Sequence, residues 1–277
     1  MSALSLKLNE SDPCVKEMIG RYSDFEAFKI FKRLLEPGGD LDIDDAGKLF
    51  YEMLEPRDIA HWAENESQFQ NLGICFLEIA EQIPYAHPSH STLVSVMIWL
   101  IQSDKVTVLT SASRYYESLE DFKTEIYGHM NERWANDVEA KRYANMASFL
   151  ARLDTEGILD ISLYVLWDMR DALEYDHSKQ PADAGNWVRV LAGLILCGGP
   201  RFFRRLVLWA PAETENNKRA YSCGPLYSGP LFGRQRWRFW HMALAAKAEE
   251  NEVDEECREL GRKAADFMAA LARDITF

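Results

Sequence analysis

The sequence predicts an all-α protein: one compact domain over residues 1–277, built from about ten helices. Apolar residues recur every three or four positions through most of the chain, as they do on the buried face of a helix. Capping residues and Gly or Pro stops separate these segments. The run "VTVL" at residues 106–109 is the only stretch that resembles a strand, and it is too short and isolated to build a sheet. We therefore expect it to be a connector.

The N-terminal part, residues 1–110, contains the first group of expected helices. Ser23 and Glu26 form a capping box before "DFEAFKIFKRLL", and Pro37-Gly38-Gly39 ends that helix. Asp42 is the expected cap of the next helix, and Pro84 stops the third segment. Helices are thus expected at about residues 23–36, 42–54, 57–82 (one or two helices) and 89–102.

The remainder, residues 111–277, is expected to be a helical core interrupted by one long loop. Residues 210–233, "APAETENNKRAYSCGPLYSGPLFG", lack periodicity and are rich in Pro and Gly. Long loops in compact domains are often functional, so this segment is a candidate lid. Helices are expected at about residues 113–135, 137–153, 158–176, 182–197, 200–209, 234–250 and 252–273.

Composition limits the classes of function. The net charge is −13, and a negative surface repels phosphate backbones, so we expect no nucleic-acid partner. The five cysteines are scattered without a C-x-x-C pair, which indicates free thiols in a reducing compartment. No apolar run is long enough to span a bilayer, and no signal peptide is visible. We expect no membrane partner and a cytoplasmic location, with a nuclear one as the alternative.

Motifs for metals and nucleotides are weak or missing. "DLDIDD" at residues 40–45 resembles the start of a calcium-binding loop, but its sixth position is Asp45 instead of Gly, and the twelfth is Tyr51 instead of Glu. His87 and His90 are separated by Pro88 and have no third ligand nearby. Phosphate-binding and dinucleotide fingerprints are absent. We therefore expect no metal and no cofactor.

The segment "RWRFW" at residues 236–240 is the most unusual stretch of the chain. On a helix, Trp237 and Trp240 share one side, and Phe239 lies roughly opposite with Met242 and Ala246. A helix with aromatic residues on two sides is usually packed between other helices, so we expect this helix to be central. Arg236 falls in a gap between the two faces and should therefore meet a carboxylate or an aromatic ring.

An ordered series of motifs resembles a known family. The series runs "NMASFLARL", "LWDMRDALE", "NWVRVLAG", the Gly/Pro loop, "GRQRWRFW" and a final helix ending "AADFM", and it covers roughly residues 110–273. It is similar to a fungal family of uncharacterised helical proteins, a domain-of-unknown-function family in which an Arg-Trp-x-Phe-Trp segment opens the penultimate helix. The resemblance implies a fungal, intracellular, helical protein and supplies no activity. The matching positions are Asn145, Phe149, Ala151, Leu153, Arg170, Ala172, Leu173, Glu174, Trp187, Ala192, Gly193, Arg236, Trp237, Phe239, Trp240 and Met268.

Two hypotheses for function follow. The first is a small-molecule-binding protein, with a cofactor-independent cyclase or isomerase acting on an apolar natural product of fungal secondary metabolism as its enzymatic form. Aromatic walls would hold the ligand, and a few polar groups would orient it. The alternative is a helical module for protein–protein interaction or regulation. No catalytic residue and no oligomeric state is assigned. The expected ligand-binding residues are Trp167, Arg170, Glu174, Trp187, Arg236, Trp237 and Trp240.

Overall fold

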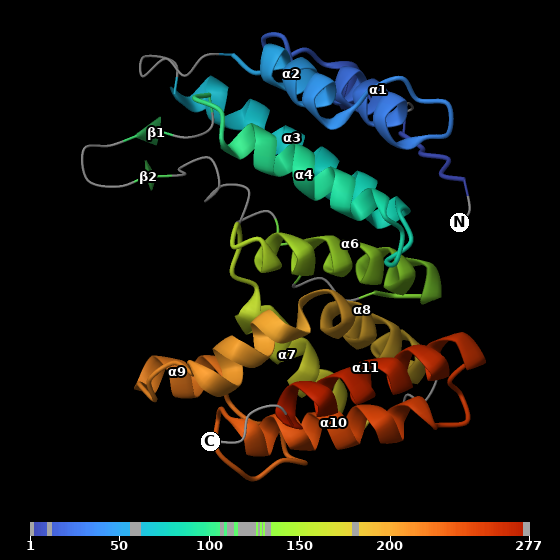
Figure 1. Ribbon diagram of the computed structural model, residues 1–277, viewed down its shortest axis with the longest axis vertical. Helices are drawn as coiled ribbons and strands as arrows, with labels where there is room; N and C mark the ends of the chain where they lie inside the picture. The colour runs from blue at the N-terminus through green and yellow to red at the C-terminus, as the bar shows by residue number, and fades with distance from the viewer. Residues whose placement is uncertain are drawn as a thin grey trace. The chain divides into compact units, whose positions relative to one another are not determined.

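The computed structural model describes residues 3–9, 13–55, 62–105, 108–109, 114–115, 126, 128, 130, 134–178 and 183–273. Within these ranges the chain forms ten α-helices, which confirms the all-α class (Figure 1). Two short strands, β1 (Val108–Leu109) and β2 (Arg114–Tyr115), form an antiparallel pair. The helix expected at 113–135 is therefore wrong at its start, and most of its other residues lie outside the described ranges.

Contacts divide the chain into two compact units, Met1–Arg133 and Trp134–Phe277. The single domain over residues 1–277 stays a prediction. In the first unit the helices are α1 (Asp24–Leu35), α2 (Ile43–Met53), α3 (Trp62–Gln82) and α4 (Ser89–Ile101), preceded by the short 3-10 helix η1 (Pro13–Lys16).

In the first unit, a capping residue sets the start of α1, and aromatic packing joins α1, α2 and α3. The side chain of Ser23 accepts a hydrogen bond from the Glu26 amide at 3.3 Å, so the expected capping residue does begin α1. The rings of Phe31, Phe50 and Phe76 come from α1, α2 and α3, and their centroids lie 4.8–5.8 Å apart. These three buried rings join the helices into one core.

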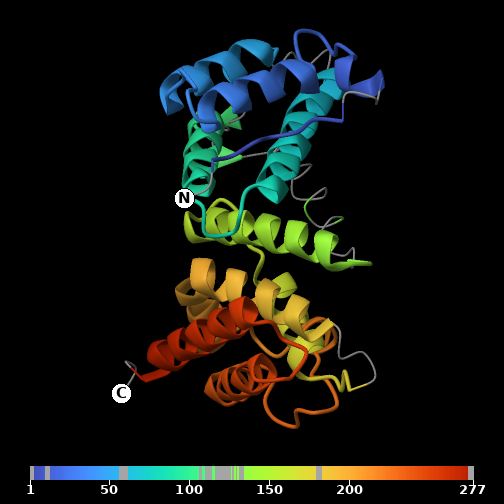
Figure 2. The same ribbon diagram turned by 90° about the vertical axis from the view of Figure 1, so that its right-hand side faces the viewer.

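The second unit is organised around α8. Its helices are α6 (Asp137–Thr155), α7 (Ser162–Leu173), α8 (Ala184–Phe203), α9 (Glu215–Ala220), α10 (Arg234–Ala248) and α11 (Glu255–Arg273). Helix α8 packs against α6, α7, α10 and α11, and α10 packs against α7, α8 and α11. Figures 1 and 2 both show α10 and α11 side by side. Helix α10, which carries RWRFW, therefore packs between other helices of this unit, as expected. Among the described helices, α8 contacts one more helix than α10 does.

Helix α8 continues where the sequence predicts a break. Separate helices were expected at 182–197 and 200–209, but α8 runs through Pro200 and passes directly into a π-helix, η4 (Arg204–Leu208). Gly198 allows this close packing, because a Cβ there would lie 2.6 Å from the Phe202 ring and 3.2 Å from the Ala151 Cβ. Burial of the Gly-rich stretch therefore outweighs the local preference for a stop at proline.

The loop expected at 210–233 contains a short helix. Thr214 caps α9 by accepting a hydrogen bond from the Asn217 amide at 3.2 Å. The expectation of a loop without helix was therefore wrong for these six residues. Helix α9 buries none of its residues, so it shows no apolar periodicity by which the sequence could predict it. The part that follows, Tyr221–Gly233, connects α9 to α10 and bears on the site.

Candidate functional site

Arg236 lies buried on α10 and forms an ion pair with Glu174, the residue that ends α7. Its Nε donates to Glu174 Oε1 at 2.7 Å and its Nη2 to Oε2 at 3.1 Å. The side chains are 1% and 0% exposed. The guanidinium also lies 5.0 Å from the centroid of the Trp240 ring. The prediction that Arg236 meets a carboxylate or an aromatic ring is confirmed for both partners.

Further hydrogen bonds satisfy both charged groups. Glu174 accepts from the Trp240 Nε1 at 2.6 Å and from the Gly224 amide at 2.6 Å. Arg236 donates to three loop carbonyls, those of Tyr221 at 2.7 Å, Ser222 at 3.0 Å and Leu231 at 2.8 Å. We call Glu174, Gly224, Arg236 and Trp240 the Glu174–Arg236 cluster. It fastens the segment 221–231 to α7 and α10.

Two further side chains hold the same loop. Trp167 donates from Nε1 to the Ala220 carbonyl at 2.6 Å. Arg170 donates to Asp171 at 3.0 Å and to the Ser222 hydroxyl at 3.4 Å. Arg170 and Glu174 are spaced i, i+4 on one helix, yet they have different partners. Glu174 turns inward to α10, while Arg170 contacts the loop.

Trp237 and Trp187 have partners outside the cluster, although the Trp237 ring also packs edge-on against the ring of the cluster residue Trp240, with centroids 6.4 Å apart. Trp237 donates from Nε1 to the Met268 carbonyl on α11 at 3.1 Å, and its ring packs edge-on against Phe203. The ring of Trp187 packs against Trp134, with centroids 4.7 Å apart. Both tryptophans therefore serve as core packing between helices in this structure.

A pocket of about 630 Å³ lies beside the cluster, between the end of α7 and one face of α10. Leu173 and Tyr175, which flank Glu174 in sequence, both line it, whereas the Glu174 carboxylate points to Arg236. Leu226 forms another wall, and its amide donates to the Glu174 carbonyl at 3.0 Å. The cluster thus fixes the loop residue that bounds the pocket. The full lining is Ala172, Leu173, Tyr175–Ser178, Leu226, Phe239, Ala243, Ala246, Lys247 and Glu249–Glu252.

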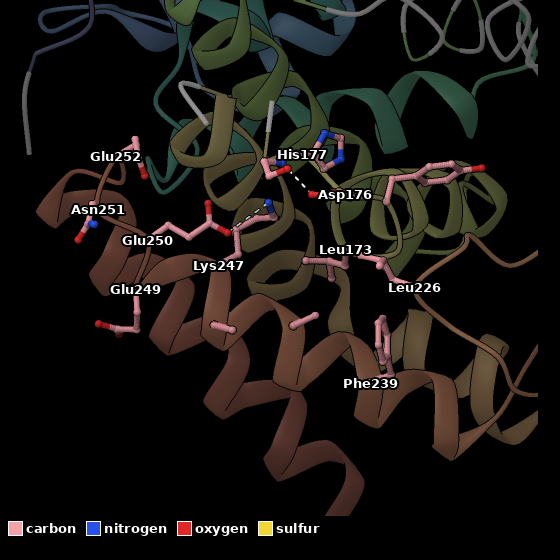
Figure 3. Close-up of a pocket in the computed structure, with 15 residues that line it drawn as sticks. Leu173, Asp176, His177, Leu226, Phe239, Lys247, Glu249, Glu250, Asn251 and Glu252 are labelled. Atoms are coloured by element: carbon pink, nitrogen blue, oxygen red, sulfur yellow. Dashed lines mark hydrogen bonds and ion pairs between the residues drawn. The ribbon is translucent and has the colours of Figure 1, made fainter. Parts of the chain in front are cut away.

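The pocket is apolar at one end and acidic at the other. Figure 3 shows Leu173, Leu226 and Phe239 gathered at one end, while the residues 249–252 lie at the opposite end. Lys247 lies between these ends, is only 8% exposed, and has its Nζ 3.7 Å from a Glu250 carboxylate oxygen. This division suits a ligand with one apolar and one polar end.

None of the seven expected ligand-binding residues is among those that line this pocket. The helical wheel predicted two buried faces on α10, and one of them is wrong. Trp237 and Trp240 are buried, but Phe239 is half-buried and Met242 is 59% exposed. The apolar residues of that second face bound a pocket together with the end of α7 instead of being fully buried. In the sequence, the helical spacing of Phe239, Ala243 and Ala246 is the signal that could have indicated this wall of the pocket.

The motifs that resemble metal sites have local structural roles. Asp40 forms an ion pair with Arg33 at 2.8 Å, and Asp42 caps α2 through the Asp45 amide. His90 contacts the Ile83 carbonyl through Nε2 at 3.0 Å. Among the described residues, no group of three or more His, Cys, Asp or Glu side chains is placed to hold a metal ion.

Titratable groups near the cluster respond mainly to burial. Burial raises the pKa of the Cys223 thiol, and the nearby Arg236 charge opposes this shift. Burial likewise raises the pKa of the Tyr227 phenol, whose ring packs against Phe239 with centroids 5.1 Å apart. Both groups therefore stay protonated at neutral pH. Within the described parts of the chain, no helix has the length and hydropathy needed to cross a bilayer.

Fold and site together define an all-helical protein with an amphipathic pocket beside a buried ion pair. The chain belongs to the family described as "Protein of unknown function (DUF3632)", whose model matches residues 74–244. That range includes Glu174, Gly224, Arg236 and Trp240 and leaves out α1, α2 and α11. No curated protein and no solved structure matches the chain. The expected membership of an uncharacterised family is confirmed.

Proposed function

We propose that the chain binds a small amphipathic organic molecule in the pocket between α7 and α10. The observation that supports this is the pocket's volume of about 630 Å³ together with its separation into apolar and acidic ends. Ligand sites of this size usually combine an apolar lining with a few polar groups that set orientation. The proposal keeps the expected small-molecule function and moves its site to the other face of α10.

The Glu174–Arg236 cluster supports this role without contacting the ligand. Buried and fully hydrogen-bonded, it holds Leu226 at the pocket wall. A preformed wall lowers the entropy that must be lost when a ligand binds. Arg236, Glu174 and Trp240 are thus positioning residues in this proposal.

A cyclase or isomerase reaction without a cofactor remains the enzymatic form of this proposal. Such a reaction depends on holding one conformer of the substrate, and the fixed apolar end of the pocket would supply that constraint. The setting in fungal secondary metabolism rests on the family resemblance, whereas the cytoplasmic location rests on the scattered cysteines, and both are part of the proposal. Incubation with a bound candidate substrate and product analysis would test turnover.

Binding can be tested with the neutral fluorescent dye Nile red. We expect saturable binding to the wild type and binding weakened about tenfold or more by Ala243→Trp, because the indole would fill the pocket. Ala245→Trp is the matched control, since Ala245 lies on the same helix and does not line the pocket. Thermal unfolding of both variants checks their folding. Equal binding by wild type and Ala243→Trp, or no saturable binding at all, would contradict the proposal.

The second candidate is a protein-interaction module, which one observation favours. Tyr175 and Leu226 line the pocket and are 44% and 54% exposed, and Met242 is 59% exposed on the same face of α10. Exposed apolar groups close together can mark an interaction surface. A Met242→Lys variant tests this candidate: loss of a captured partner, with Nile red binding unchanged, would favour the interaction module over the small-molecule site.

A further inference from the structure

We infer that the pocket selects ligands whose polar end carries a positive charge, such as a primary amine or a quaternary ammonium attached to an apolar body. This inference rests on the proposed small-molecule function and adds the chemical class of the ligand. It is carried by the sign and the pairing of the charges that line the pocket, together with their position relative to its apolar end.

Carboxylates dominate the charged lining. Asp176, Glu249, Glu250 and Glu252 line the pocket, and among the described residues that line it Lys247 is the only Lys or Arg. Counting these five side chains gives a net charge of −3 (four negative and one positive). This charged lining would therefore attract a ligand cation and would repel a carboxylate or a phosphate.

Ion pairs reduce this charge only in part. Glu249 is held by Arg262, which lies outside the pocket and donates to its two oxygens at 2.6 and 2.8 Å, and the Nε of Arg258 lies 3.9 Å from Oε2 of the same carboxylate. Glu250 is paired with Lys247. Glu252 is exposed and forms no ion pair within the described residues, so its carboxylate can contact a ligand directly. The acidic end therefore keeps the exposed carboxylate of Glu252, while Glu249 and Glu250 are compensated by Arg262, Arg258 and Lys247.

The charges and the apolar groups fix an orientation. An apolar body would occupy the end formed by Leu173, Leu226 and Phe239, and a cation at the other end of the same molecule would face the residues 249–252 (Figure 3). Lys247 lies between the two ends and can donate to an acceptor in the middle of the ligand. The volume of about 630 Å³ lies within the range of about 300–1,000 Å³ that is usual for small-molecule pockets.

Three probes that differ only at the head group test the inference: octylammonium, 1-octanol and octanoate. Titration calorimetry of the wild type should give octylammonium the lowest Kd, about threefold to tenfold below that of 1-octanol, and octanoate the highest. Added salt should reduce the advantage of octylammonium, because exposed charges are screened.

Charge variants locate the preference within the molecule. The double variant D176N/E252Q should bring the Kd of octylammonium close to that of 1-octanol. The control E213Q/E256Q removes two exposed carboxylates outside the pocket lining and should keep the preference. Ala243→Trp should abolish binding of octylammonium together with that of 1-octanol.

Each contrary outcome has a distinct meaning. Equal Kd values for octylammonium and 1-octanol, with Nile red still bound in the pocket, would overturn the cation preference and leave the proposed function standing. A preference that survives in D176N/E252Q or in Ala243→Trp would also overturn it, because the attraction would then come from elsewhere on the surface. Failure of Nile red and all three probes to bind would overturn the proposed function itself. Tighter binding of a polylysine peptide than of octylammonium would instead favour a protein partner.

Discussion

Replacement of Arg236 by alanine is the sharpest test of the structure. The change removes five hydrogen bonds: two to Glu174 and one each to the carbonyls of Tyr221, Ser222 and Leu231. It leaves the Glu174 carboxylate buried with the Trp240 and Gly224 donors but without a counter-charge. The loop carbonyls also lose their partner.

The magnitude follows from the burial of the pair. Removal of one partner of a buried ion pair costs about 3–5 kcal/mol, because the other charge stays buried and uncompensated. Opening of the segment 221–231 to water limits the cost, since water can then reach Glu174 and the three carbonyls. For a unit of this size, each kcal/mol lowers Tm by about 2–4 °C, so we expect a decrease of about 10 °C.

Unfolding in urea and by heat, followed by tryptophan fluorescence, measures this effect. Six of the eight tryptophans lie in Trp134–Phe277, so the signal reports mainly on the unit that contains Arg236. Hydrogen exchange in 221–231 should also become faster in R236A. The control R238A removes an exposed arginine of the same helix and should change the free energy of unfolding by less than about 0.5 kcal/mol. A loss below about 1 kcal/mol in R236A, or equal losses in both variants, would refute the reasoning.

Three further outcomes are expected. Trp240→Phe removes the Nε1 donor to Glu174 and should lower the free energy of unfolding by about 1–3 kcal/mol in urea, whereas full stability would show that this bond contributes nothing. Gly224→Ala should destabilise by about 1–3 kcal/mol, since its Cβ would lie 2.7 Å from the Glu174 carbonyl oxygen; Gly185→Ala, with open space, should be neutral or slightly stabilising, and equal effects would argue against the tight contact. Burial raises the pKa of the Cys257 thiol from 9.0 to about 11, so the folded state favours the protonated thiol and stability should fall as pH rises from 9 towards 11. Urea unfolding across this range should show a shallower pH dependence for Cys257→Ala, and an identical slope would contradict this account.

The sequence predicted the all-α class and the environment of Arg236 for the same reason. Helical periodicity is a local property, and it placed Arg236 beside an aromatic face, where burial requires a partner. Glu174 could be named as a candidate because it lies in the motif "LWDMRDALE", four positions after Arg170. Its pairing with Arg236, 62 positions further along the chain, depends on the packing of α7 against α10 and carries no local signal.

The pocket and the course of α8 could not be predicted in this way. Phe239, Ala243 and Ala246 show the same spacing whether another helix covers them or a pocket lies over them, so periodicity cannot separate these cases. At Pro200 the local rule favours a helix end, but close packing through Gly198 keeps α8 continuous. In both places the outcome depends on neighbours distant in sequence.

The opposite orientations of adjacent side chains at the end of α7 have a consequence for evolution. Glu174 faces the ion pair, while Leu173 and Tyr175 on either side of it face the pocket. Substitutions at the exposed Tyr175 would alter the shape of the pocket at little cost to folding, whereas Leu173 is buried and Glu174 and Arg236 can change only together. We expect members of the family to share the pair and to differ at the position of Tyr175, so that one stable scaffold accommodates different ligands.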